Sequence, residues 1–395
     1  METSMNKPLS NITVLDLSSL LPGPFCSMIM ADFGARVIKI ERPKIGDIMR
    51  DYTPRYPAYS GNFSILNRNK ESMTLNLKSD EGKRLFFKLV ERSDVLIEGF
   101  RPGVMNRLGL GYEALSKVNK GLIYCSISGF GQESPYRDFV GHDINYLGLN
   151  GALDLAGTKN DPPTLPGVLV ADIGGGAYPA LTGILLALLA RQMTKRGQFI
   201  DISMMDGSFF WLYFAAGTYF PSGETPSRGG ELTNGGSPRY QVYATKDGRH
   251  LAVGAIEDQF WNRLCDLLDI DDPRVRIHDH EDPDFAITVL AEKFSSRTAR
   301  EWADAFEGKD LCCCMIRDFK EAVSDPHFKV RGLIQTITGP DGTSQTLLGN
   351  PIKMSESSAE IRQAAPLLGG DNQKILNELG YSESECEALS EQGVI

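Results

Sequence analysis

The sequence contains little of what metal or disulfide chemistry requires. Five histidines and seven cysteines are spread over 395 residues, and none of their spacings resembles a zinc site. The cysteines are odd in number and irregularly spaced, which does not fit a disulfide framework. Three are adjacent, at 312–314, where neighbouring strand side chains would point to opposite faces and chelate poorly. We predict no metal site, and we expect residues 311–316 to form a buried strand in which cysteine acts as a small hydrophobic residue.

Long apolar runs and targeting segments are also lacking. The longest apolar stretch, residues 181–190, is about half of the ~20 residues that a membrane-spanning helix needs, and it indicates a buried helix. The first residues show no basic segment followed by an apolar one, and the final GVI is not a peroxisomal address. The formal net charge of −10 argues against broad nucleic-acid binding. We expect a cytoplasmic protein with neither a membrane nor a nucleic acid as partner.

Fingerprints of common cofactors and catalytic centres are missing as well. The first expected strand, residues 12–17, is followed by SSLLPGPFCS and not by the GxGxxG turn of dinucleotide-binding folds. The glycine-rich stretch at 234–240 lacks the GK[ST] ending of a phosphate loop. No GxSxG, HExxH or cysteine–histidine signature occurs. These absences argue against a nicotinamide cofactor, a P-loop and the usual hydrolase centres.

The first 130 residues alternate short strand patterns with helical ones, which predicts a parallel sheet covered by helices. Ser79 is the expected N-cap of one of these helices, because two acidic residues follow it in the first turn. A long helix is expected from Asp172 to about Met193. The expected strands are 12–17, 35–41, 73–77, 94–100, 121–128 and 198–204, and the expected helices are 24–34, 79–93 and 208–217.

A change of composition marks a second unit. Residues 221–238 are rich in glycine and proline, which is typical of a loop or linker. Beyond them, 240–245 and 249–257 are expected to pair as strands, with helices at about 258–268, 285–295 and 299–307. We therefore predict a smaller α/β unit at about 225–330. The tail from 331 returns to strand and helix patterns, with a helix expected at 371–379.

Basic residues follow several expected strands. Arg42 comes directly after the second strand, Arg68 and Lys70 lie in NRNK, and Arg101 follows a further strand. Open α/β sheets bind ligands at the carboxyl ends of their strands, and arginine and lysine suit phosphate oxygens. The cluster is consistent with a local anion site in an acidic protein. Ordinary solvated surface is the alternative.

The segment GHDINY, residues 141–146, is the strongest motif. Helical spacing follows it, so His142 and Asp143 lie at a helix start, where free backbone N–H groups can hold a developing oxyanion. A structural histidine is the alternative. Asp172 precedes three glycines and another helix, so it is either an N-cap or a catalytic carboxylate. The glycines 174–176 are costly in a helix and indicate close approach of backbone or ligand. Glu257 follows a strand and opens a helix, where a first-turn acid is also favoured by the helix dipole.

In order and spacing, several segments resemble the family III CoA-transferases, most closely the α-methylacyl-CoA racemase branch. They are LPGPFCSMIMADFGARVIKIERP, NRNKESMTLNLKS, DVLIEGFRPGVMNRLGLGYE, GHDINY, VADIGGG and VGAIEDQF. The resemblance covers nearly the whole chain and is weakest after about residue 270. It implies an α/β fold with a large Rossmann-like, CoA-binding domain (1–220 and 331–395) and a smaller α/β domain (225–330). It also implies an interlocked homodimer, with the active site between the large domain of one subunit and the small domain of the other.

The resemblance further implies roles for individual residues. His142 and Asp172 would be the acid/base pair that inverts the α-carbon of a 2-methylacyl-CoA thioester through an enolate, with Glu257 as a supporting acid. No metal, flavin or nicotinamide is required. The alternative is a CoA-transferase that moves CoA to a carboxylate with Asp172 as nucleophile; a third class is a non-enzymatic acyl-CoA-binding protein. The residues expected to bind CoA are Arg42, Lys70 and Arg101 at the nucleotide and phosphates, and Asp143 and Tyr146 at the thioester and pantetheine.

One residue departs from the racemase pattern. Arg239, beside Tyr240 in the glycine-rich stretch, places a charge where that branch is more apolar or aromatic. If Arg239 faces the acyl pocket, the substrate would carry a polar or carboxylate tail.

Overall fold

The structure, a computed structural model, describes residues 7–395 and divides the chain into two compact units. The larger unit contains the chain up to Asn150, Val168–Trp211 and Pro326–Ile395, and the smaller unit contains Gly151–Gly167 and Leu212–Asp325. These bounds differ from those expected from sequence, because 151–167 and 212–220 group with the smaller unit. The first of these segments is bound there by side-chain contacts: Asn234 Nδ2 donates to Leu155 O at 3.4 Å, and Lys159 pairs with Asp284 at 3.0 Å.

The larger unit is built on a six-stranded, wholly parallel sheet with the strand order β3-β2-β1-β4-β5-β6. The order runs outward in both directions from β1 and β4, so these two neighbours form the topological switch point of an open α/β sheet. The expected fold class, α/β with a parallel sheet in the large domain, is confirmed. The strands are β1 (Thr13–Asp16), β2 (Arg36–Glu41), β3 (Lys70–Thr74), β4 (Val95–Glu98), β5 (Ile123–Ser128) and β6 (Phe199–Ser203).

Strand β3 begins earlier than the expected 73–77. Its first residue, Lys70, pairs with Val37 of β2, whereas Leu75 N donates to Glu41 O as the strand ends and Asn76 already belongs to the following turn. The first half of β3 reads KES, so its polar side chains concealed it from a search for alternating apolar residues. These side chains are buried or half-buried among charged partners.

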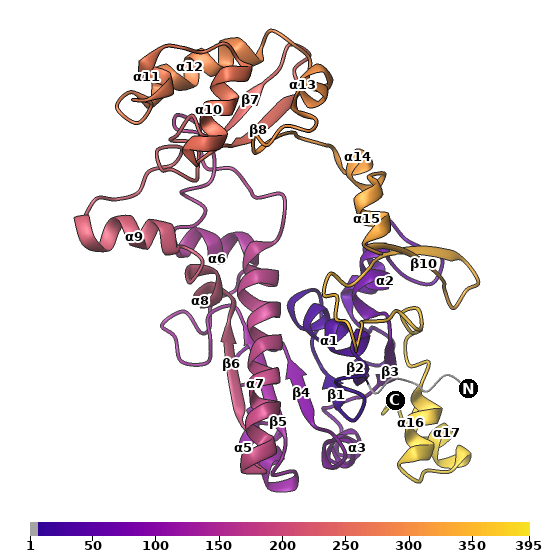
Figure 1. Ribbon diagram of the computed structural model, residues 1–395. Coiled ribbons are helices and arrows are strands. Elements are labelled where there is room, and N and C mark those ends of the chain that lie inside the picture. Colours follow the sequence, from indigo (N-terminus) through magenta and orange to yellow (C-terminus); the bar gives the residue numbers. More distant parts are fainter. Residues whose placement is uncertain (1–6) are drawn as a thin grey trace. The chain divides into compact units, whose positions relative to one another are not determined.

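Helices cover the sheet of the larger unit. Helix α3 (Asp80–Glu91) is capped as expected, since Ser79 Oγ accepts from Gly82 N at 3.0 Å. Helix α7 (Tyr178–Thr194) packs against β5 and β6 (Figure 1). Apolar side chains of the sheet and α3 share one core with the C-terminal helices. The other helical elements of this unit are α1 (Pro22–Asp32), η1 (Ile48–Asp51), α2 (Gly61–Asn67), α4 (Val104–Arg107), α5 (Tyr112–Val118), α6 (Asp143–Leu149), the π-helix η2 (Val170–Ala177), α8 (Met204–Phe209), α15 (Pro326–Val330), α16 (Asn372–Glu378) and α17 (Glu383–Glu391).

The C-terminal segment closes the β3 edge of the sheet. Asp371 Oδ2 accepts from Ser72 N at 2.8 Å, and Asn372 Oδ1 accepts from Thr74 N at 2.9 Å. Side chains thus satisfy edge amides that would otherwise be open to another strand. The same part of the chain contains the hairpin β10 (Ile334–Thr338) and β11 (Ser344–Leu348).

The single helix expected at 208–217 is wrong. Helix α8 ends at Phe209, and α9 (Tyr213–Ser222) begins after a break at 210–212, where the chain passes from one unit to the other. The ring of Trp211 closes over η2, because a Cβ placed on Gly174 would lie 2.5 Å from it. Packing of this apolar segment therefore overrides its continuous helical pattern.

The smaller unit has an antiparallel sheet of order β7-β8-β9. The expected pairing of the first two strands is confirmed. The run of cysteines is less buried than expected: β9 is an edge strand that begins at Cys313, and both Cys312 and Cys314 are exposed. The elements of this unit are β7 (Tyr240–Ala244), β8 (His250–Gly254), β9 (Cys313–Met315), α9, α10 (Asp258–Leu267), α11 (Pro273–Arg276), α12 (Pro283–Phe294), α13 (Ala299–Phe306) and α14 (Phe319–Val323).

Candidate active site

A cavity of about 610 Å³ lies in the larger unit at the carboxyl ends of β1, β4 and β5. Its walls are the loops that follow these strands, at 18–23, 99–102 and 127–130, together with residues of 137–146 and Asp172. The cavity therefore sits beside the topological switch point, where open α/β sheets bind their ligands. His142, Tyr146, Asp172 and Arg101 all line it. Four of the residues singled out from sequence are thus brought together by the fold.

His142 occupies the N-cap position of α6 and is exposed toward the cavity. Its backbone is extended, with φ −124° and ψ 178°, and its N–H donates to Asn145 Oδ1 at 3.0 Å. Asn145 is the third residue of the helix, so this bond is the returning half of a capping box. The cap fixes the backbone that carries His142 and leaves the imidazole free of the core, which fits a proton carrier better than a structural histidine.

Asp143 joins the starts of two helical segments. It is buried, and its Oδ1 accepts from the backbone N–H of Asp172 at 2.9 Å. Asp172 lies in the first turn of η2, so α6 and η2 begin side by side. The N-cap position of η2 is Leu169, and Asp172 is the third residue of this helix, so its carboxylate is not the N-cap. This arrangement favours the catalytic interpretation of Asp172 over a simple N-cap.

The electrostatic surroundings of Asp172 favour proton transfer near neutral pH. Burial, and then the neighbouring carboxylate of Asp143, raise the pKa of Asp172 to about 6, although His142 acts in the opposite direction. A carboxyl group in this range can both donate and accept a proton at physiological pH. Burial, followed by Asp172 and Asp143, raises the pKa of Tyr146 to about 12, so the phenol stays protonated. The Tyr146 hydroxyl donates to Gly141 O at 2.7 Å.

The glycines after Asp172 permit close backbone approach. A Cβ on Gly175 would lie 2.4 Å from Met204 O, and one on Gly207 of α8 would lie 2.1 Å from Gly175 O. The backbones of η2 and α8 therefore touch, which no larger residue would allow. The expectation from sequence is confirmed for an approach by backbone. This contact holds the start of η2, and with it Asp172, against the rest of the unit.

The cations expected to bind CoA fall into two groups. Arg101 lines the cavity, and Arg42 is exposed at the end of β2. Lys70 is different: its side chain is 0% exposed and pairs with Asp16 at 3.1 Å, and Nζ also donates to Pro24 O. Arg68 is likewise buried, in a pair with Asp32. The structure thus contradicts a phosphate-binding role for Lys70, because a strand that is buried on both faces turns its cations inward.

Sequence reasoning missed other residues that line the cavity. Arg137 is exposed there, in the loop between β5 and α6. It lies well beyond the end of the expected strand 121–128, whereas Arg101 directly follows its strand, so a search for basic residues at strand ends does not reach Arg137. Residues Ser18–Leu20 also form part of the wall. Its sequence shows no charge or glycine fingerprint, and nothing in it signals a site.

Two residues of the smaller unit were also singled out. Glu257 is exposed at the N-cap position of α10. Arg239 pairs with Asp279 at 2.7 Å and with Asp258 at 2.7 Å, and it donates to Ile256 O at 3.1 Å. These partners within its own unit occupy the guanidinium. The arginine therefore gives no support to a substrate with a carboxylate tail.

The sheet order defines the larger unit as a Rossmann-like α/β fold with a cavity at its switch point. A family model, CoA-transferase family III, matches residues 9–372, and the chain belongs to this family. It is 36% identical to human alpha-methylacyl-CoA racemase over 389 residues, covering 98% of this chain and 97% of the relative. It is 31% identical to human succinyl-CoA:glutarate CoA-transferase over 407 residues, covering 100% and 92%.

A solved structure confirms the fold. The crystal structure of a CAIB/BAIF family protein from Brucella suis matches with a TM-score of 0.82 and 31% identity, covering 95% of this chain and 100% of that one. The chain is therefore an enzyme of the family III CoA-transferase and racemase group. Both kinds of activity occur among its relatives at similar identity.

Proposed function

We propose that this enzyme inverts the α-carbon of a 2-methylacyl-CoA thioester by 1,1-proton transfer. The observation that carries the proposal is the pair His142 and Asp172, which line one cavity from the starts of two adjoining helical segments. Inversion at carbon needs two proton carriers, one for each face. The raised pKa of Asp172, about 6, suits this task.

The proposed reaction has two proton steps. For one enantiomer His142 removes the α-proton, and for the other Asp172 does so. The electron pair of the broken C–H bond moves onto the thioester oxygen to form an enolate. Backbone N–H groups of the first turn of α6, near Asp143, would stabilise this oxygen. The second carrier then delivers its proton to the opposite face of the carbon, which restores the thioester.

Other residues would bind and support the substrate. Arg101 and Arg42 are proposed to hold the phosphates of CoA, Tyr146 to line the pantetheine region, and Glu257 to act as the supporting acid. General acid–base catalysis typically contributes about 10²–10⁴-fold. Most enzymes reach at least about 10⁶-fold, so the oxyanion site and substrate positioning must supply the rest. The chemistry needs no metal, flavin or nicotinamide.

CoA transfer from an acyl-CoA to a carboxylate is the second candidate, favoured by the identity to a succinyl-CoA:glutarate CoA-transferase. In that reaction the Asp172 carboxylate would attack the thioester carbonyl and displace the CoA thiolate, which gives an acyl anhydride. The thiolate would then attack the aspartyl carbonyl and release the first acid as its carboxylate, so that CoA is held as a thioester on Asp172 until the acceptor carboxylate takes it by the same two steps in reverse. A carboxyl with a pKa of about 6 is mostly ionised at pH 7, so it can also serve as a nucleophile. His142 distinguishes the two chemistries, because attack by Asp172 needs no second proton carrier on the opposite face.

Incubation of each enantiomer of a 2-methylacyl-CoA in D₂O tests the proposal. A racemase incorporates deuterium at the α-carbon and loses optical purity. Transfer of CoA to an added carboxylate without deuterium incorporation would refute the racemase in favour of the transferase. His142→Gln is the matched variant: it should abolish racemisation, whereas a transferase should keep much of its activity. An acyl-CoA-binding protein would show turnover in neither assay.

We also propose that the enzyme works as a homodimer. Helix α7 exposes several large apolar side chains, and three consecutive ones are exposed at and after the end of α8, where Phe210 is 84% exposed. Large exposed apolar surface usually marks an interface. Light scattering at micromolar concentration should give twice the monomer mass; a monomer that retains full activity would contradict the proposal. The side chains concerned are Leu185, Leu186, Leu189, Met193, Phe209, Phe210 and Trp211.

A further inference from the structure

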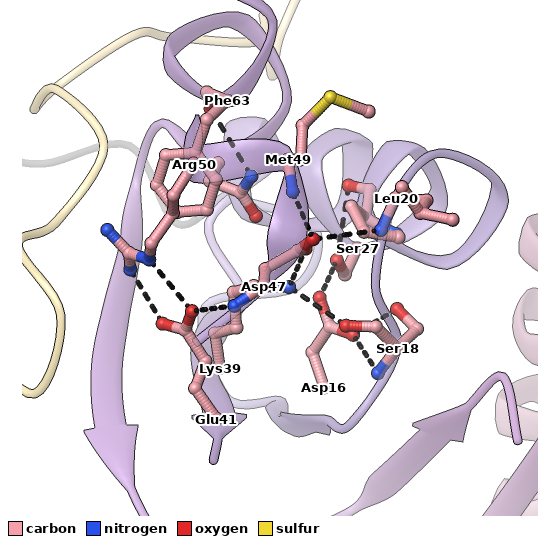
Figure 2. Close-up of polar contacts among 12 residues, drawn as sticks. Asp16, Ser18, Leu20, Ser27, Lys39, Glu41, Asp47, Met49, Arg50 and Phe63 are labelled. Atoms are coloured by element: carbon pink, nitrogen blue, oxygen red, sulfur yellow. Dashed lines mark hydrogen bonds and ion pairs between the residues drawn. The ribbon is translucent and has the colours of Figure 1, made fainter. Parts of the chain in front are cut away.

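One wall of the cavity is held by two buried charges. After β1, residues Ser18–Leu20 line the cavity that His142 and Asp172 also line. Lys39 Nζ donates to Ser18 O at 2.9 Å, and Asp47 Oδ1 accepts from Leu20 N at 3.1 Å (Figure 2). The two charged side chains therefore hydrogen-bond to the backbone on either side of Ser19, the middle residue of this wall.

Lys39 and Asp47 also form an ion pair with each other. Lys39 Nζ lies 2.9 Å from Asp47 Oδ2, and the side chains are 0% and 1% exposed. Among the residues that the structure describes, no partner other than the Lys39 ammonium is found for Asp47 Oδ2. Burial lowers the pKa of Lys39, but the carboxylates of Asp47 and Asp16 offset this, and the net shift is upward. The Lys39 side chain is therefore charged.

The backbone of Ser18–Leu20 includes a conformation that is unfavourable without supporting contacts. Leu20 has a φ of +64°, in the left-handed region that non-glycine residues adopt at a cost. The Ser18 N–H donates to Asp16 Oδ1 at 3.0 Å, and the Ser18 hydroxyl bonds the same carboxylate. Asp47 is itself fixed, because its N–H donates to Glu41 Oε2 at 2.9 Å, and Glu41 pairs with Arg50.

Stability alone does not explain the pair. A buried ion pair is often no more stabilising than apolar residues of similar volume, because both charges lose their hydration. Lys39 lies within β2, whose neighbouring positions are Val37, Ile38 and Ile40, and an apolar residue would suit its place. What the charges do achieve is directional bonding to backbone groups on both sides of the wall's middle residue.

We infer that Lys39 and Asp47 are positioning residues that hold Ser18–Leu20 as a preformed wall for the acyl-CoA thioester. The inference rests on the proposed function, since it concerns the same cavity. Neither residue touches the reacting atoms. They act by keeping the wall at a fixed distance from the carriers His142 and Asp172.

The decisive variant is the double substitution K39M/D47N. It removes both charges together, so no uncompensated ion stays buried, and the side-chain amide oxygen introduced at position 47 can still accept from Leu20 N. The bond to Ser18 O is lost. The matched control is R68M/D32N, which neutralises another buried pair of the same unit, 2.8 Å apart, whose residues do not line the cavity. Should the double variant fail to fold, Lys39→Arg keeps the charge but moves the donor.

Three measurements separate positioning from stability: the melting temperature, hydrogen exchange of the peptide that contains Ser18–Leu20, and kcat and KM for racemisation. We expect K39M/D47N to exchange these amides faster and to lose about tenfold to a hundredfold in kcat/KM, the range expected for misplacement of about 1 Å. The control should keep kcat/KM within about threefold at a similar melting temperature. An equal loss in the control, or unchanged exchange and kinetics in K39M/D47N, overturns the inference.

Failure of the proposed function gives a different pattern. If the wild type shows transferase and no racemase turnover, the same comparison is made with transferase kinetics. If the wild type turns over neither substrate, the proposed function fails. The positioning role is then judged by hydrogen exchange and by the affinity for the 2-methylacyl-CoA. Unchanged exchange or unchanged affinity in K39M/D47N would reject it.

Discussion

Replacing Asp172 with asparagine should make the protein more stable at high pH. The folded state raises the pKa of this carboxyl from 3.8 to about 6. Between these values the folded protein binds more protons than the unfolded chain, so the wild type loses stability as pH rises from about 4 to 6. Asparagine resembles the protonated acid and carries no such cost.

The size of the effect follows from the shift. A difference of about 2 units at 1.36 kcal/mol per unit gives an upper bound of about 3 kcal/mol. Because Asp172 is partly exposed, solvent screening reduces the expected gain to about 1–2 kcal/mol. The gain should be close to zero at pH 4, grow up to about pH 6, and stay constant above it.

Thermal unfolding of the wild type and D172N from pH 4 to pH 8 measures this difference. D271N is the control, because Asp271 is fully exposed and its only ion pair within residues 7–395, to Arg276, spans 3.9 Å. The control should follow the wild type at every pH. A difference between D172N and the wild type that does not depend on pH, or a less stable D172N at pH 8, would refute the idea that the site strains the ionised carboxylate.

Three further predictions concern the same unit. Asp143→Asn removes the charge beside Asp172, so the acid limb of the kcat/KM profile should move down by about 0.5–1 pH unit; an upward shift would contradict this assignment. Gly175→Ala should lower stability by about 1–3 kcal/mol, since its Cβ would meet backbone at 2.4 Å, whereas Gly148→Ala, with nothing within 4 Å, should be neutral or stabilising in the same unfolding assay. Arg101→Met should raise KM for the acyl-CoA about tenfold with less change in kcat; a changed kcat at constant KM would remove Arg101 from phosphate binding.

Local sequence patterns predicted the frame of the fold well, because most of its elements bury an apolar face. Helix α3 shows this, with its Ser79 cap and buried face. Helix η2 shows the limit: three glycines indicated close approach, but the segment that approaches them, α8, lies more than 25 residues further along the chain. Distant packing of this kind leaves no local pattern.

Some residues of the candidate site could be predicted from local sequence and others could not. His142 and Asp172 were found because each carries chemistry at the start of a helix. Lys70 was placed wrongly because residue type and spacing do not tell which way a side chain points. Its strand is buried on both faces, and Asp16, 54 residues earlier in the chain, takes its charge. The sequence does not indicate a role for Lys39 either. Its contact with the site is a hydrogen bond to Ser18 O, in a loop that precedes its own strand in the chain.

The buried lysines Lys39 and Lys70 have different roles in the same sheet. Lys70 and Asp16 neutralise each other beside β1, and burial holds the pKa of Lys70 down, at about 8. Lys39 is held ionised by three carboxylates and donates to a backbone carbonyl of the cavity wall. Lys70 also donates to a backbone carbonyl, but to that of Pro24, which does not line the cavity. We therefore expect Lys39→Met and Lys70→Met, compared at equal loss of melting temperature, to differ in KM for the acyl-CoA, with the larger rise in Lys39→Met.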